Sequence, residues 1–89
     1  MKNIGGEMRI VYTDHARLRM AMRGVTEAEV RETVESPDAV LPGEAGVEEI
    51  AVRHCGNRDV RVVYEEVEAD HIVVITVMKP KVRREEQEN

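Results

Sequence analysis

The sequence of 89 residues contains no tryptophan and no phenylalanine, and Tyr12 and Tyr64 are its only aromatic side chains. The hydrophobic core must therefore be built mainly from valine, isoleucine, leucine, methionine and alanine. A chain of this length forms one domain at most, near the lower end of chains that bury a self-sufficient core. Contact with a partner chain, or with a second copy in a homodimer, would add to that modest core.

Cys55 is the single cysteine, so a disulfide within the chain is excluded and a reducing compartment is favoured. The sequence shows neither an apolar run long enough to span a membrane nor a charged-then-apolar signal peptide. We therefore expect a cytoplasmic protein that does not enter a membrane.

Signals for metals and cofactors are weak. His54 and Cys55, with His15 and His71 elsewhere in the chain, invite comparison with a zinc site. However, the adjacent pair lacks the usual spacing of zinc ligands and would point to opposite sides of a strand. The sequence also has no glycine-rich phosphate loop and no dinucleotide-binding fingerprint. We expect neither a metal nor a cofactor.

The net charge of −5 at pH 7 argues against a nucleic-acid-binding protein, because phosphate binding usually needs a basic surface. The charges are nevertheless unevenly distributed. Basic residues gather in segments 17–23 and 79–84, and acidic residues gather in segments 65–68 and 85–88. Such a dipolar surface can bind an anion at one face and a basic partner at another, although a solvated mixed surface is the plainer interpretation.

Two short helices are predicted near the start of the chain. Thr13 or Asp14 can cap the first helix, and Gly24 ends it. Thr26 and Glu29 match a capping box for the second helix, which ends before the Ser-Pro dipeptide at 36–37. The apolar residues expected to face the core are Leu18, Ala21, Met22 and Val25 in the first helix and Val30 and Val34 in the second.

Strands are predicted on both sides of this helical pair. A short β-prone segment precedes it, and from residue 38 the hydrophobic period changes to two. The last strand is apolar on both faces, so it should be covered on both sides or pair tightly with a neighbour. The predicted strands are residues 9–12, 39–41, 48–54, 60–67 and 71–78.

The predicted element order is β-α-α-β-β-β-β. It indicates an α+β fold, in which two N-terminal helices pack on one face of a mostly antiparallel twisted sheet. Residues 1–7 are expected to be a disordered lead, residues 8–80 a single domain and residues 81–89 a charged tail.

His15, Arg19 and Arg23 recur at i, i+4 spacing and therefore share one edge of the first helix. The two like charges repel each other by a few tenths of a kcal/mol in an isolated helix. Either an acidic partner within the fold or an anion such as an RNA phosphate should offset that repulsion. The acidic candidates within the fold are Glu44, Glu48 and Glu65.

The element order resembles that of the RelE/ParE-like superfamily of small bacterial toxins, which place two N-terminal helices against a twisted antiparallel sheet. The local pattern is more specific. It looks like an uncharacterised family of domains of unknown function that is often grouped with BrnT-like toxins, and it covers about residues 12–79. The residues that carry the likeness are His15-Ala16, Arg19-Met20, Arg23-Gly24-Val25, and the strand sequences at 60–64 and 73–77.

This resemblance implies a metal-independent endoribonuclease of the toxin–antitoxin type, held in check by an antitoxin protein. His15 would be its general acid or base, because histidine titrates near working pH. Arg19 and Arg23 would bind the RNA phosphate, since their donors match phosphate oxygens. The residues that could complete the site are Arg61, Tyr64 and Lys79.

The chain departs from the pattern in two ways. It is acidic overall, whereas ribosome-dependent members of the superfamily tend to be basic. Some relatives carry a catalytic tyrosine or arginine near the C-terminus, and here only Arg83 and Arg84 stand in that region.

Each of these residues also has a structural interpretation. His15 can hydrogen-bond to the sheet or to a carboxylate, and Arg61 within a strand is more often part of a cross-strand ion pair. Tyr64 can lie at the edge of the core with its hydroxyl satisfied. The alternative function is a non-catalytic interaction domain whose basic helix edge binds an acidic partner or another copy of the chain.

Overall fold

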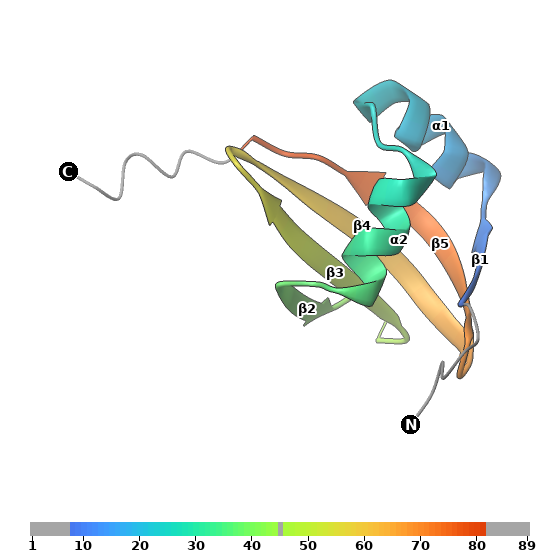
Figure 1. The fold of residues 1–89 in the computed structure, drawn as a ribbon. Helices are drawn as coiled ribbons and strands as arrows, with labels where there is room; N and C mark the ends of the chain where they lie inside the picture. The colour runs from blue at the N-terminus through green and yellow to red at the C-terminus, as the bar shows by residue number, and fades with distance from the viewer. Residues whose placement is uncertain (1–7, 45, 82–89) are drawn as a thin grey trace.

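The computed structural model describes residues 8–44 and 46–81, which form two helices and one sheet (Figure 1). The predicted order β-α-α-β-β-β-β and the α+β class are confirmed. The expected lead at 1–7 and the expected tail from residue 82 onward lie outside the described residues. The elements are β1 (Arg9–Tyr12), α1 (Asp14–Arg23), α2 (Glu27–Glu35), β2 (Ala39–Pro42), β3 (Glu48–Cys55), β4 (Arg58–Glu68) and β5 (His71–Met78).

Capping residues determine where the two helices begin and end. The Thr13 hydroxyl accepts the backbone N–H of Ala16 at 3.0 Å, which makes Thr13 the N-cap of α1. The capping box of α2 is complete, because Thr26 and Glu29 each accept the other's backbone N–H, at 3.1 and 2.9 Å. Gly24 ends α1 with φ 69°, a left-handed conformation that glycine adopts without side-chain strain.

The sheet has the strand order β1-β5-β4-β3-β2. Neighbouring strands from β2 to β5 are antiparallel, whereas β1 runs parallel to β5 and pairs only with its residues 71–74. At that point Thr13 donates its backbone N–H to the Val74 carbonyl at 3.2 Å and its hydroxyl to the Ile75 carbonyl at 3.1 Å. The chain then continues into α1, which packs against β5 (Figure 1).

The core lies between the two helices and one face of the sheet. Ala16 and Met20 of α1 and Val30 of α2 are buried in the same cluster as Val62 and Val74 of the sheet. Both helices therefore cover one face, as predicted. The side chains that complete the buried cluster are Val25, Ala51, Val60, Tyr64, Ile72 and Val77.

The predicted core stripe of α1 is wrong in part. Val25 is buried, but Leu18 and Met22 are 57% and 62% exposed, and Ala16 and Met20 face the sheet instead. The reason is tertiary, because the hydrogen bonds from Thr13 to β5 set the rotation of α1. Positions three and seven residues after Thr13 then lie against the strand.

The predicted core positions of α2 and β5 also need correction. Val30 is fully buried, but Val34 is only partly buried, and Thr33 is fully buried with its hydroxyl donating to the Glu29 carbonyl at 2.7 Å. The strand β5 does pair on both edges, with β1 and β4. The second face of β5 is not fully covered, because both helices lie on the other side of the sheet. Val73, on this second face, is accordingly only half-buried.

We predict that Thr13→Ala destabilises the protein by about 2 kcal/mol, because it removes both the helix cap and the hydrogen bond to Ile75. Thr26→Ala is the matched control, since Thr26 caps α2 and makes no hydrogen bond to the sheet among the described residues, and it should cost about 1 kcal/mol. Urea unfolding measures both free energies. Equal losses for the two variants would show that the bond to Ile75 contributes nothing.

Candidate functional site

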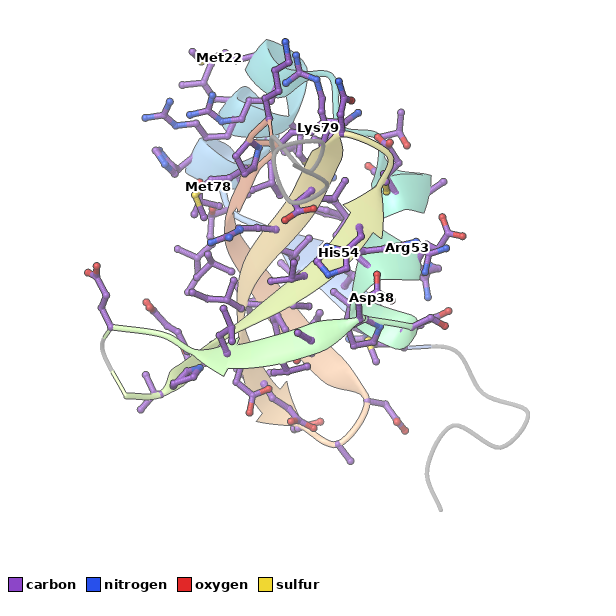
Figure 2. All side chains as sticks on the ribbon, turned by 90° about the vertical axis from the view of Figure 1, so that its left-hand side faces the viewer. Met22, Asp38, Arg53, His54, Met78 and Lys79 are labelled. Atoms are coloured by element: carbon purple, nitrogen blue, oxygen red, sulfur yellow. The ribbon has the colours of Figure 1, made fainter. Side chains whose placement is uncertain are left out.

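An open pocket of about 980 Å³ lies where the end of α1 meets the start of β4 and the end of β5. The antiparallel pairing of β4 with β5 brings those two strand ends together, and Gly24 ends the helix beside them. Figure 2 shows Met22, Met78 and Lys79 at this end of the molecule. The full lining is Met22, Arg23, Gly24, Arg58, Arg61, Met78, Lys79 and Pro80.

The pocket is strongly cationic, because four of its lining residues are arginine or lysine and none is acidic. Lys79 is partly neutralised, since its Nζ atom lies 3.3 Å from Glu29 Oε2. Arg58 donates one guanidinium N–H to the Lys79 carbonyl at 3.2 Å, which holds the arginine against the end of β5. Within the described ranges 8–44 and 46–81, no carboxylate forms an ion pair with Arg23, Arg58 or Arg61.

Arg61 has an unsatisfied donor. Its Nε atom is buried and has no hydrogen-bond partner in the part of the chain that the structure describes. On either side of it in the sheet are Val52 and Met78, neither of which carries a polar side chain. A buried N–H without an acceptor costs about 1–3 kcal/mol. The expected cross-strand ion pair is therefore not present among the described residues, and a bound anion would satisfy this donor.

The predicted basic edge of α1 is accessible. His15 and Arg23 are exposed and Arg19 is half-buried. Arg19 donates Nε–H to His15 Nε2 at 3.4 Å, a long and therefore weak hydrogen bond. The structure does not support the pairing of Arg19 or Arg23 with an internal acid. The candidates Glu44, Glu48 and Glu65 form no ion pair with either arginine in the described regions.

Tyr64 lies away from the pocket, in the core between the sheet and the helices. Its hydroxyl donates to Glu49 Oε1 at 2.9 Å. Burial raises the pKa of Tyr64 far above its usual value, and the hydrogen bond to the Glu49 carboxylate raises it further. Tyr64 is therefore held as a neutral phenol that supports the sheet.

The structure brings together three of the residues predicted from the sequence, Arg23, Arg61 and Lys79, in one pocket. It does not place His15, Arg19 or Tyr64 in the lining. Arg58, Met22 and Met78 are lining residues that the sequence analysis missed. A signal for Arg58 existed, because pairing the predicted strands 60–67 and 71–78 across their short turn places the start of one beside the end of the other.

Two further properties concern metals and membranes. In residues 8–44 and 46–81, no three histidine, cysteine, aspartate or glutamate side chains are grouped so that they could hold a metal ion. The two helices of that part of the chain are too short and too polar to cross a membrane.

Comparison with known proteins identifies a family but no characterised relative. Residues 12–79 match the family described as Domain of unknown function (DUF4258), and the chain belongs to this family. No curated protein and no solved structure matches the chain significantly.

Glu29, which joins the capping box to the pocket, makes stability depend on pH. The backbone N–H of Thr26 lowers the pKa of Glu29 below its usual 4.5, and Lys79 lowers it further against the opposing effect of burial. A lowered pKa in the folded state means that the carboxylate stabilises the fold fully above pH 4.5. This contribution is lost as the pH falls through the lowered pKa.

We predict that Glu29→Gln reduces stability at about pH 7, and that this loss becomes smaller at about pH 2, because the wild-type carboxyl takes up a proton as the pH falls through its lowered pKa. Urea unfolding at the two pH values measures this difference. Glu27→Gln is the control, because it removes a charge from the same helical turn without breaking the capping box. An equal loss at both pH values in Glu29→Gln would contradict the linkage.

Proposed function

We propose that this member of the DUF4258 family is a toxin-like, metal-independent endoribonuclease that binds an RNA phosphate in the pocket between α1 and the ends of β4 and β5. One observation carries the proposal. Arg23, Arg58 and Arg61 line a single pocket with no carboxylate to neutralise them among the described residues. Phosphate oxygens match arginine donors and would accept the buried Nε–H of Arg61.

The apolar part of the pocket favours a nucleotide as the ligand rather than a bare inorganic anion. Met22 is 62% exposed, and both Met22 and Met78 line the pocket. Thioether side chains are flexible and polarisable, so they adapt to flat apolar surfaces such as a nucleobase. A phosphate on the arginines and a base or ribose against the methionines would use both kinds of lining.

The basic edge of α1 offers a continuation of the binding site. Arg19 and His15 lie one and two turns before Arg23, which corresponds to about 6 and 12 Å along the helix axis. A strand of RNA that begins at the pocket can therefore place its neighbouring phosphates along α1. In this arrangement Arg19 adds a phosphate contact, and His15 stays available as a general acid or base.

The resemblance to RelE/ParE-like and BrnT-like toxins supports the ribonuclease part of the proposal and its partner, an antitoxin protein. The support is by analogy, because one fold can serve many activities. The second candidate is a non-catalytic domain that binds an acidic protein segment in the same pocket. Two observations favour this non-catalytic alternative. The chain has a net charge of −5, and the pocket lining contains no histidine or carboxylate that could transfer protons in catalysis.

We predict that Arg61→Ala and Arg23→Ala each weaken binding of single-stranded RNA by about ten- to a hundredfold, since a charge-assisted hydrogen bond contributes about 1.5–3 kcal/mol. Each variant should also lower the slope of the logarithm of the RNA-binding constant against the logarithm of the salt concentration by about one, because one phosphate contact is lost. Fluorescence anisotropy at several salt concentrations measures both effects. Arg31→Ala is the control, because Arg31 pairs with Glu35 on α2 outside the pocket.

The ribonuclease is distinguished from the interaction domain by its effect on cells and on RNA. We predict that induced expression in a bacterium arrests growth and fragments RNA, and that Arg61→Ala removes both effects. Growth curves and RNA gels measure them. Normal growth with intact RNA, together with tight binding of an acidic peptide by the pure protein, would support the non-catalytic alternative instead.

A further inference from the structure

The two faces of the sheet differ in what covers them. Both helices lie on one face, over the buried cluster that contains Ala51 and Val62 (Figure 1). Neighbouring side chains of a strand point to opposite faces, so Ile50 and Val63 point away from the helices. The described elements are two helices and one sheet, and none of them packs on this second face, the open face.

The centre of the open face is apolar. The strand register places Leu41, Ile50 and Val63 in one row across β2, β3 and β4. Leu41 is 42% exposed and Ile50 is half-buried. Val11 of β1, which lies on the same face, is also 42% exposed. Exposed apolar side chains that gather on one face are typical of a surface that another protein surface covers.

An acidic pair lies to one side of this central row. Glu48 and Glu65 stand directly opposite each other in the register of β3 and β4, and like charges in that position repel. Both residues are half-buried. Neither carboxylate forms an ion pair within residues 8–44 and 46–81. The described part of the fold therefore gives this pair no neutralising cation.

A cation lies to the other side of the central row. Arg61 precedes Val63 by two residues, whereas Glu65 follows Val63 by two, so each lies about 7 Å from Val63 along β4. The Nε atom of Arg61 is buried and lacks a hydrogen-bond partner among the described residues. The open face thus carries an unmatched base and an unmatched acid at equal distances from its apolar centre.

We propose that the open face is the interface of a homodimer, in which two sheets stack face to face around a two-fold axis along the row of Val63. This rotation lays β4 antiparallel over β4 of the second copy, so that Val63 meets its own counterpart. Arg61 then lies over Glu65 of the second copy, and Glu65 lies over the second copy's Arg61. Stacked sheets are about 10 Å apart, a gap that an arginine and a glutamate side chain span together.

The second copy is the occupant because the face is complementary to itself. Symmetry forms each ion pair twice, and each one supplies an acceptor to the buried Nε–H of Arg61 and a cation to the repelling pair of Glu48 and Glu65. Five strands about 4.8 Å apart and about 20 Å long form a face of about 500 Å². Two such faces bury on the order of 1,000 Å², the lower bound for a specific interface.

The homodimer stands on its own observations and does not rest on the ribonuclease proposal, but the two share Arg61. Because Arg61 also lines the pocket, a phosphate and Glu65 of the second copy compete for the same Nε–H. Binding of RNA and formation of the dimer therefore oppose each other. The dimer is the state in which the RNA pocket lacks one of its arginines.

A charge swap tests the interface. In sedimentation equilibrium, we expect the wild-type chain to dimerise at about 100 μM, and Arg61→Glu and Glu65→Arg each to weaken the dimer by at least about tenfold. The double variant Arg61→Glu/Glu65→Arg should return to within about threefold of the wild type. Glu35→Arg on α2 is the control, because it makes the same charge change as Glu65→Arg on the helix side of the sheet.

Circular dichroism shows which variants are folded. A wild-type chain that stays monomeric at all concentrations would overturn the inference. So would a dimer that neither single variant weakens, or a folded double variant that stays monomeric.

A measurement on the unmodified chain avoids the risk that a variant fails to fold. In a mixture of isotope-labelled and unlabelled copies, we expect NOEs between copies that involve the methyl groups of Val63, Ile50 and Leu41. NOEs only from Leu18 and Met22, the exposed apolar residues of α1, would place the dimer on another surface and overturn the inference.

Added single-stranded RNA separates the two proposals. We expect RNA to shift the wild-type dimer towards the monomer. A dimer that stays intact with RNA bound would overturn the placement of Arg61 in the interface. Failure of RNA to bind, with the dimer intact and sensitive to the charge swap, would contradict the ribonuclease proposal and support the homodimer.

Discussion

The pairing of β4 with β5 is the constraint on which both the core and the candidate site depend. The register shifts between Val63 and Tyr64, so that Val63 pairs with Thr76 but Tyr64 pairs with Val74. This irregularity adds one residue to β5, and a bulge of that kind reverses which face the following side chains occupy. Val74 and Val77, three residues apart, can therefore both be buried under the helices. The carbonyl of the additional residue, Ile75, accepts the hydroxyl of Thr13 and so fixes where α1 lies.

The same pairing concentrates positive charge at one end of an acidic protein. Beyond the bulge, Arg61 stands opposite Met78, and Arg58 forms a bridge with Lys81 just past the end of β5. The end of α1 brings Arg23 to the same place, where its charge also complements the helix dipole. Elsewhere, arginines are neutralised locally, as in the Arg17–Glu27, Arg31–Glu35 and Arg53–Glu32 ion pairs. Net charge is thus a poor guide to the local field at the pocket, where Arg23, Arg58 and Arg61 form no ion pair among the described residues.

The candidate site was partly predictable, and the reasons differ from residue to residue. Arg23 was found because helical spacing alone places it on the basic edge of α1, whereas Arg19 on the same edge does not line the pocket. Arg58 was missed because its place in the pocket depends on neighbours in another strand, which requires knowledge of the strand register. His54 drew attention in the sequence only as a zinc candidate, since nothing in the order of residues indicates that its ring meets Asp59. Tyr64 could not be assigned to a face until the register with Glu49 and Val74 was known.

The sequence by itself determined the elements, because their signals are local. Thr13, Gly24, the Thr26–Glu29 capping box and the change of period after residue 38 each act within a few residues, and all agree with the structure. Only the tertiary structure decided which face of α1 is buried, which carboxylates meet which cations, and which polar groups share a pocket. These properties depend on a strand register and on a helix rotation that contacts such as Thr13 to Ile75, 62 residues apart, establish together. No short stretch of sequence contains that information.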